Sequence, residues 1–188
     1  MAAPRKAFLI TITLGLLAAA CTPLRVVDNA GPVPGPPLLL AVEFRVWQTV
    51  SGEVLPEPIA SSSFTAAIAD TLERNLSNAC TATDAAVEEA RGGLALYRRL
   101  SEEMLARPQL ADGSHGVGPS LQGLVTGQEC RQGLVLMGEW DSVRGWLSLG
   151  SIDLASGKLL RLAAVEFDQA EPDLLRRHTR RLLRKVSP

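Results

Sequence analysis

Few side chains in this 188-residue chain are of the types that carry out catalysis. Its two histidines, His115 and His178, are far apart in the sequence. Ser114 precedes His115 in a polar loop, but sequence neighbours rarely reach the geometry that a nucleophile and its base require. The motifs of zinc proteases, P-loop nucleotide-binding proteins and serine hydrolases are absent from the sequence. We therefore expect no catalytic residues, no metal site and no cofactor, and the chain is predicted not to be an enzyme.

Acidic residues occur in adjacent pairs at positions 88–89 and 102–103. Catalysis by paired carboxylates requires both groups to line one cleft. Because both pairs fall on an expected helix, we interpret them as solvated helix faces. Asp153, beside an expected hairpin turn, is predicted to stabilise that turn rather than to bind a metal.

The N-terminus is organised like a secretion signal. A basic pair precedes an apolar run over 7–20, which is shorter than the about 20 residues of a membrane-spanning helix and typical of a signal peptide. The run ends in Leu17-Ala18-Ala19-Ala20-Cys21, which resembles the bacterial lipobox. The resemblance implies removal of residues 1–20 and a lipid on Cys21. The alternatives are an ordinary secretory signal with a chance cysteine, or an uncleaved membrane anchor.

Residue 22 is threonine rather than aspartate, which by the sorting rule of enteric-type lipoproteins resembles export to the periplasmic face of the outer membrane. The segment 21–37 is predicted to be a tether after the lipidated cysteine. Its proline- and glycine-rich part, 31–37, has few amide donors and several fixed φ angles. At roughly 3 Å per residue such a tether could extend to about 50 Å.

Two further cysteines, Cys80 and Cys130, are expected to form a structural disulfide in the oxidising periplasm. Closing a loop of about fifty residues stabilises a fold by about 4 kcal/mol in the chain-entropy model. Reduced core thiols and a catalytic cysteine are the alternatives, although no C-x-x-C spacing supports redox chemistry.

Residues 38–188 have the size of one domain. The hydrophobic periodicity predicts strands over 38–47, 134–140, 143–154 and 159–167, and helices over 63–79, 84–107, 119–131 and from Pro172 onward. The expected fold class is α+β. We expect one small sandwich, in which a mostly antiparallel sheet of about four strands, ending in a meander, packs against about four helices.

Three stretches resemble a group of periplasmic lipoprotein domains: Ala-Val-Glu-Phe at 41–44, Leu-Val-Leu-Met-Gly-Glu-Trp at 134–140 and the hairpin containing Asp153 and Gly157. The group includes curli-secretion channel lipoproteins, flagellar outer-membrane lipoproteins and lipoprotein activators of penicillin-binding proteins. The resemblance implies a similar architecture over 38–167. It does not imply a pore, because the membrane-spanning hairpin of the channel formers is not evident.

The C-terminal helix is predicted to be basic and amphipathic. Leu175, Leu182, Leu183 and Val186 fall on one stripe, and it is flanked by Arg176, Arg177, Arg180, Arg181, Arg184 and Lys185. One interpretation is a surface helix docked by its leucines with solvated cations. The other is that the cations meet anionic lipid or an acidic partner, since arginine pairs well with phosphate and carboxylate.

The whole chain has a formal net charge of −1, which gives no electrostatic case for a nucleic-acid partner. We expect a non-catalytic accessory or assembly lipoprotein of a cell-envelope complex, held on the membrane by the lipid on Cys21 and contacting envelope proteins. Trp47, Trp140 or Trp146 could anchor such a contact, although core packing is expected for at least two of them. The alternative functions are a carrier of a small ligand, glycan or lipid, and then a hydrolase.

Overall fold

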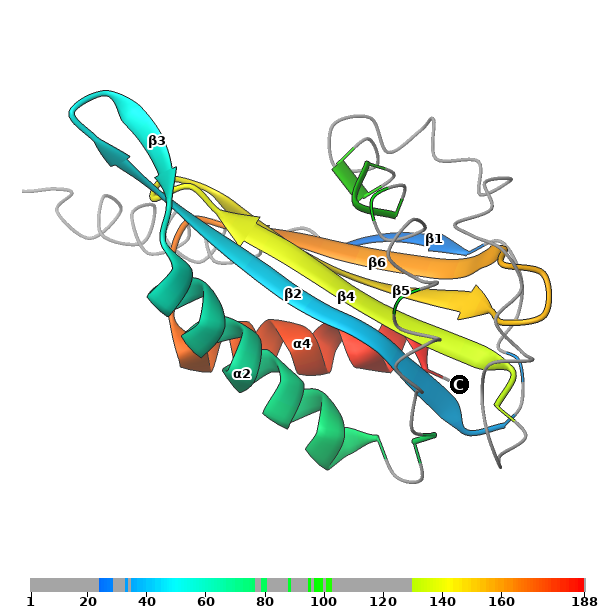
Figure 1. Cartoon of the computed structure of the whole chain (residues 1–188). Coiled ribbons are helices and arrows are strands. Elements are labelled where there is room, and N and C mark those ends of the chain that lie inside the picture. Colours follow the sequence, from blue (N-terminus) through cyan, green and yellow to red (C-terminus); the bar gives the residue numbers. More distant parts are fainter. Residues whose placement is uncertain are drawn as a thin grey trace, which may run out of the picture.

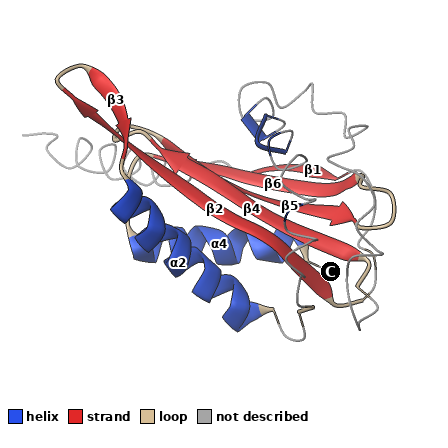
Figure 2. Cartoon of the chain, in the orientation of Figure 1, coloured by secondary structure: helices blue, strands red, loops and turns tan. Residues whose placement is uncertain are grey.

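A computed structural model of the chain describes residues 24–28, 33, 35–76, 79–80, 88, 95, 97–99, 101–102 and 130–187. Its elements are β1 (Leu24–Asp28), β2 (Pro37–Val50), β3 (Glu53–Pro56), α2 (Pro58–Asn75), β4 (Gln132–Trp140), β5 (Gly145–Asp153), β6 (Leu159–Phe167) and α4 (Pro172–Val186). The six strands form one sheet in the order β1-β6-β5-β4-β2-β3 (Figure 1). Helices α2 and α4 lie side by side against one face of that sheet (Figure 2).

The predicted α+β class is confirmed, and the sheet is mostly antiparallel, with β2 and β4 as its parallel pair. The expected meander is β4-β5-β6. The prediction of about four strands is wrong, because β1 and β3 extend the sheet at its two margins. The expected helices over 84–107 and 119–131 lie mostly outside the described residues, so α2 and α4 are the helices with described bounds.

Strand β1 falls inside the segment 21–37, and the tether prediction is wrong for these five residues. The sequence Leu-Arg-Val-Val-Asp pairs antiparallel with β6, from Leu24 opposite Val165 to Asp28 opposite Arg161. Leucine and two adjacent valines favour a pleated, partly buried strand over solvated chain. The folded domain therefore begins before the proline-rich stretch, and not after it.

The β2–β3 hairpin replaces a predicted loop around Gly52 and Pro56. Its turn is Ser51-Gly52, with φ angles of 56° and 87°, which match the tight hairpin turns that need positive φ at both central positions. Helix α2 then starts at Pro58, earlier than predicted. Glu57 caps it, since its carboxylate accepts hydrogen bonds from the amides of Ile59 and Ala60, so the serines at 61–63 are not the cap.

Both faces of the sheet bury apolar side chains. On the helical face, α2 and α4 cover a core built around Phe44, Leu72, Leu147 and Leu182. On the opposite face a second core contains Leu38, Tyr97, Met137 and the two cysteines of the disulfide. The register of β2 against β4 shifts between Leu39 and Ala41. The continuous apolar run at the start of β2 has a separate cause, since side chains from this part of the strand pack into the cores on both faces of the sheet.

Candidate functional site

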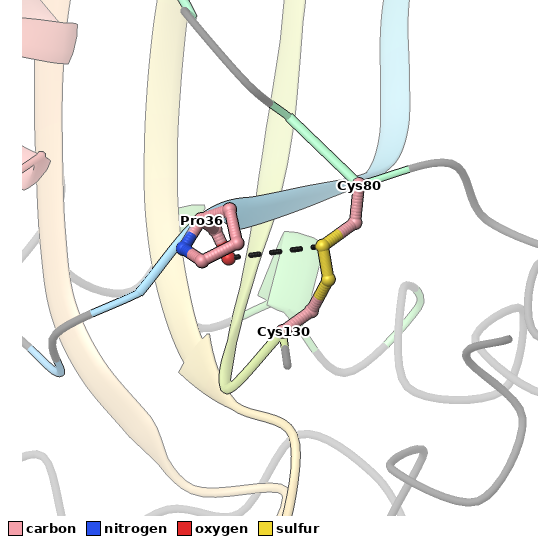
Figure 3. Close-up of a disulfide and its surroundings, with 3 residues drawn as sticks. All are labelled: Pro36, Cys80 and Cys130. Atoms are coloured by element: carbon pink, nitrogen blue, oxygen red, sulfur yellow. Dashed lines mark hydrogen bonds between the residues drawn. A yellow bond between two sulfur atoms is a disulfide. The ribbon is translucent and has the colours of Figure 1, made fainter. Parts of the chain in front are cut away.

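The predicted disulfide joins Cys80 to Cys130, with their Cα atoms 6.4 Å apart (Figure 3). Both cysteines are buried. The amide of Cys80 donates a hydrogen bond to the carbonyl of Pro37 at 2.8 Å, and its sulfur lies 3.9 Å from the carbonyl oxygen of Pro36. Cys80 lies beside the start of β2, and Cys130 is two residues before β4 begins, so the bridge links these two places at one end of the sheet. This is a structural position, with both thiols consumed in the bond.

Helix α4 docks on the sheet as the first interpretation of its pattern predicted. Leu175, Leu182, Leu183 and Val186 are buried against β5, β6 and α2. The predicted basic residues divide by exposure: Arg177, Arg180, Arg184 and Lys185 are exposed, whereas Arg176 and Arg181 are half-buried. Arg176 pairs with Asp173 one turn earlier, at 2.8 Å. The exposed face of α4 therefore presents four cations to whatever adjoins it.

The end of α4 is held by a cation from the sheet. Arg161 of β6 donates from Nη1 to the carbonyl of Lys185 at 3.1 Å, and its Nη2 lies 2.7 Å from the carboxylate of Asp28 in β1. A positive group at the C-terminal end of a helix is favourable because the last carbonyls there lack intrahelical partners. Arg161 therefore links β1, β6 and α4 at one end of the domain.

His178 lies on the inner side of α4 rather than among the exposed cations. Its ring stacks on Phe167 of β6 at a centroid distance of 5.6 Å, and the residue is 7% exposed. Within the described part of the chain, Nε2 has no hydrogen-bond partner. Burial, followed by the charges of Arg181 and Arg177, lowers the pKa of His178 below its usual value. The imidazole is therefore a neutral packing group.

A cluster of charged residues lies on the opposite face of the sheet. The guanidinium of Arg98 is 3.1 Å from Glu43 of β2 and 3.6 Å from Glu139 of β4, and it lies over the ring of Trp146 at 5.9 Å. Burial raises the pKa of Glu43, but the hydrogen bond from Arg45 and the charge of Arg98 outweigh it and hold the pKa below its usual value. The cluster is a set of compensated charges that fixes residue 98 against the sheet.

Buried hydroxyl groups form a second polar cluster on this face. The hydroxyl of Tyr97 donates to Oγ of Ser148 at 3.3 Å, and Oγ of Ser148 is 3.0 Å from Oγ of Ser101. All three residues are fully buried, and burial raises the pKa of Tyr97 well above its usual value. The hydroxyls satisfy one another, and a strongly raised pKa keeps the tyrosine a neutral hydrogen-bond donor.

Most of the exposed large apolar side chains gather at one end of the sheet. Five of the six among the described residues are in the β2–β3 hairpin, the first turn of α2 and the β4–β5 turn: Val50, Val54, Leu55, Ile59 and Val143. Oγ of Ser142 donates to the carbonyl of Trp47 at 3.0 Å, which joins the β4–β5 turn to the base of the hairpin. We call this region the hairpin end (Figure 1).

The other residues considered from the sequence fall as follows. Cys21, Ser114 and His115 lie outside the described residues. Glu88 and Glu102 are exposed. The carboxylate of Asp153 accepts hydrogen bonds from the amides of Ala155 and Ser156, so it stabilises its hairpin turn as expected. Trp146 is buried, and Trp47 and Trp140 are half-buried.

The described residues contain no group of three or more His, Cys, Asp or Glu side chains placed to hold a metal ion. In the same part of the chain, no helix has the length and apolar character to cross a membrane.

No family model matches the chain, and no curated protein matches it. Two similar solved structures are PelC dodecamers from Paraburkholderia phytofirmans, the first of them a variant with one leucine replaced by methionine. They share 11% and 13% sequence identity, cover 89% of this chain and 98% and 99% of their own chains, and have TM-scores of 0.42 and 0.40. Similarity at this level carries no argument about this chain.

Proposed function

We propose that this chain is a lipoprotein, anchored through Cys21 to the periplasmic face of the outer membrane, that acts as a non-catalytic accessory or assembly component of a cell-envelope complex. The observation that carries the proposal is the Cys80–Cys130 disulfide in a chain that starts with a lipobox-like signal. Disulfides persist in oxidising compartments such as the periplasm, so the bridge and the signal agree on export.

The non-catalytic role is supported by how the polar groups are used. Arg98, Glu43 and Glu139 compensate one another, and the hydroxyls of Tyr97, Ser148 and Ser101 satisfy one another. Groups engaged in this way serve packing and positioning. The exposed cations of α4 are instead available for an acidic surface on a partner protein. The carrier function has no observation in its favour among the described residues.

The test is a crosslinking pull-down of the mature protein from outer-membrane extracts, with Cys21→Ser as the unlipidated control. We expect mass spectrometry to show acyl chains on Cys21, and stoichiometric protein partners that are lost with the control. An unmodified Cys21 would overturn the anchoring. A lipidated protein without any stoichiometric partner would overturn the accessory role.

A further inference from the structure

The register of the sheet fixes the end of the domain at which the chain enters β1. Leu24 is opposite Val165, two residues before β6 ends at Phe167. Phe167 is opposite Gly145, the first residue of β5, and Gly145 is opposite Trp140, the last residue of β4. Trp140 is in turn opposite Val46 in β2, just before the β2–β3 hairpin. The start of β1 therefore lies at the hairpin end.

The distance from Cys21 to this end is limited by the chain itself. Cys21 precedes Leu24 by three residues, and consecutive Cα atoms are 3.8 Å apart, so the two Cα atoms are separated by at most about 11 Å. The proline-rich stretch 31–37 follows β1 in the sequence, so it is not part of the connection between Cys21 and β1 and cannot lengthen it. If Cys21 carries a lipid, as proposed above, the start of β1 is held close to the bilayer, and the hairpin end is the end of the sheet that faces it.

The side chains at the hairpin end suit that position. Ile59 is 80% exposed, Val143 70% and Val54 64%. They belong to three separate parts of the chain at the same end of the sheet: Val54 to strand β3, Ile59 to the first turn of α2 and Val143 to the β4–β5 turn. Single exposed apolar residues are ordinary on protein surfaces, but a concentration of them marks a contact site for protein or membrane. The short link to Cys21 favours membrane as the contact if that cysteine is lipidated.

We propose that the hairpin end of the domain rests on the phospholipid bilayer, with Val143, Ile59 and the tip of the β2–β3 hairpin entering its interfacial layer. This inference depends on the proposed lipidation of Cys21. We expect the contact to be apolar rather than electrostatic, because the exposed charges around it, Glu53, Asp141 and Arg144, give no excess of cations, and Glu57 is half-buried. It should therefore form on zwitterionic lipid and persist at high salt, since screening weakens only electrostatic attraction.

The test compares two positions at opposite ends of β5. Val143→Cys places a thiol at the hairpin end, and Ala155→Cys places one in the exposed β5–β6 turn, about 30 Å away along the strand. Since Cys80 and Cys130 are bridged and the sulfur of lipidated Cys21 is occupied by its thioether, each variant has one free thiol for an environment-sensitive NBD dye. The full lipidated protein is reconstituted into zwitterionic phosphatidylethanolamine–phosphatidylcholine vesicles, with and without nitroxide-labelled lipid. Val54→Cys provides a second reporter at the hairpin end.

We expect the dye at positions 143 and 54 to shift its emission to shorter wavelength and to be quenched by the nitroxide lipid, at low and at high salt. The dye at position 155 should show neither change. Equal quenching at both ends, or stronger quenching at 155, would overturn the orientation while leaving the lipoprotein proposal intact. Mass spectrometry of Cys21 in the same preparation separates the two failures, because an unacylated Cys21 would overturn the lipoprotein proposal and this inference with it.

Discussion

The ring of Tyr97 lies directly against Gly150 of β5: a Cβ atom built at position 150 would be only 2.8 Å from Cζ and from the hydroxyl oxygen of the ring. The same hydroxyl donates to Ser148, two residues away on the same face of β5. A small side chain at 148 and no side chain at 150 therefore allow the tyrosine to lie flat on the sheet.

Replacement of Gly150 by alanine should destabilise the domain. The added methyl group overlaps a ring that is fully buried, and overpacking of a core costs about 1–3 kcal/mol. Urea unfolding followed by circular dichroism measures the change in the free energy of unfolding. In a Tyr97→Ala background the same substitution should cost almost nothing, because the ring is gone. An equal cost in both backgrounds would contradict the contact.

His178 should make the domain less stable in mild acid. Its pKa is lowered in the folded protein by burial and by Arg181 and Arg177, whereas in the unfolded chain it is near 6.5. Between these two values the unfolded chain binds more protons, so the stabilisation present above about pH 6.5 is lost as the pH falls through the folded-state pKa.

His178→Phe tests this titration, since it retains a ring against Phe167 and removes the ionisable group. We expect the free energy of unfolding of the variant to fall less than that of the wild type between about pH 7 and about pH 5. Urea titrations at the two pH values give the comparison. Parallel losses in both proteins would assign the acid sensitivity to the carboxylates instead.

Loss of the Cys80–Cys130 bridge should be a major destabilisation. The cysteines are 50 residues apart in sequence, and opening a loop of this size costs about 4 kcal/mol in the chain-entropy model. Cys80→Ser and Cys130→Ser, introduced together into the Cys21→Ser variant, should lower its urea midpoint, and Cys21→Ser alone, which retains the bridge, is the control. Reduction with dithiothreitol should lower the urea midpoint of the control only, because the variant without Cys80 and Cys130 has no bridge to reduce. Equal urea midpoints for the two proteins in the absence of reductant would argue against the bridge in solution.

Neutralising the exposed cations of α4 should weaken partner binding without weakening the fold. Arg177, Arg180 and Arg184 are exposed, so their replacement by glutamine should leave the urea midpoint close to that of the wild type. In the crosslinking pull-down we expect lower recovery of partners at low salt and a smaller loss on adding salt. Glutamine at Arg74, Arg131 and Lys158 removes the same charge elsewhere. An equal effect of both triple variants would dismiss a specific role for α4.

The position of the exposed α4 cations in the domain limits which kind of surface they can contact. The carbonyl of Lys185 accepts a hydrogen bond from Arg161, which also pairs with Asp28. Asp28 is the last residue of β1, whereas Leu24 is the first and lies at the hairpin end. If the hairpin end rests on the bilayer, as proposed above, the C-terminal part of α4 points away from that membrane. An acidic protein surface thus suits Arg184 and Lys185 better than the lipid next to Cys21 does.

The strongly patterned C-terminal half was predictable from sequence. The strand predicted over 159–167 has the observed bounds of β6, the two strands before it differ by two residues or fewer at each end, and the last helix begins at Pro172 as expected. These elements combine periodic apolar residues with clear turn signals, so local information was sufficient.

Elements and contacts that depend on distant partners were not predictable. Strands β1 and β3 are short and adjoin proline, and β1 becomes a strand only because β6 offers it an edge. The contacts of Arg98 with Glu43 and Glu139 join residues from three separate parts of the chain. Ser51-Gly52 was a usable turn signal for the β2–β3 hairpin, and it indicates that the loop prediction gave too much weight to the prolines.

The two strands at the margins of the sheet also affect how the molecules behave when crowded. Lipid anchoring confines molecules to two dimensions and brings them into frequent lateral collision, where an open strand could recruit a neighbouring copy into a continuous sheet. Strand β3 is four residues long, begins with Glu53 and ends with Pro56, while β1 is five residues long and carries ion-paired Arg25 and Asp28. Short, charged and proline-terminated margins give a poor template for such growth, so crowding these domains in a layer should not join them edge to edge into one sheet.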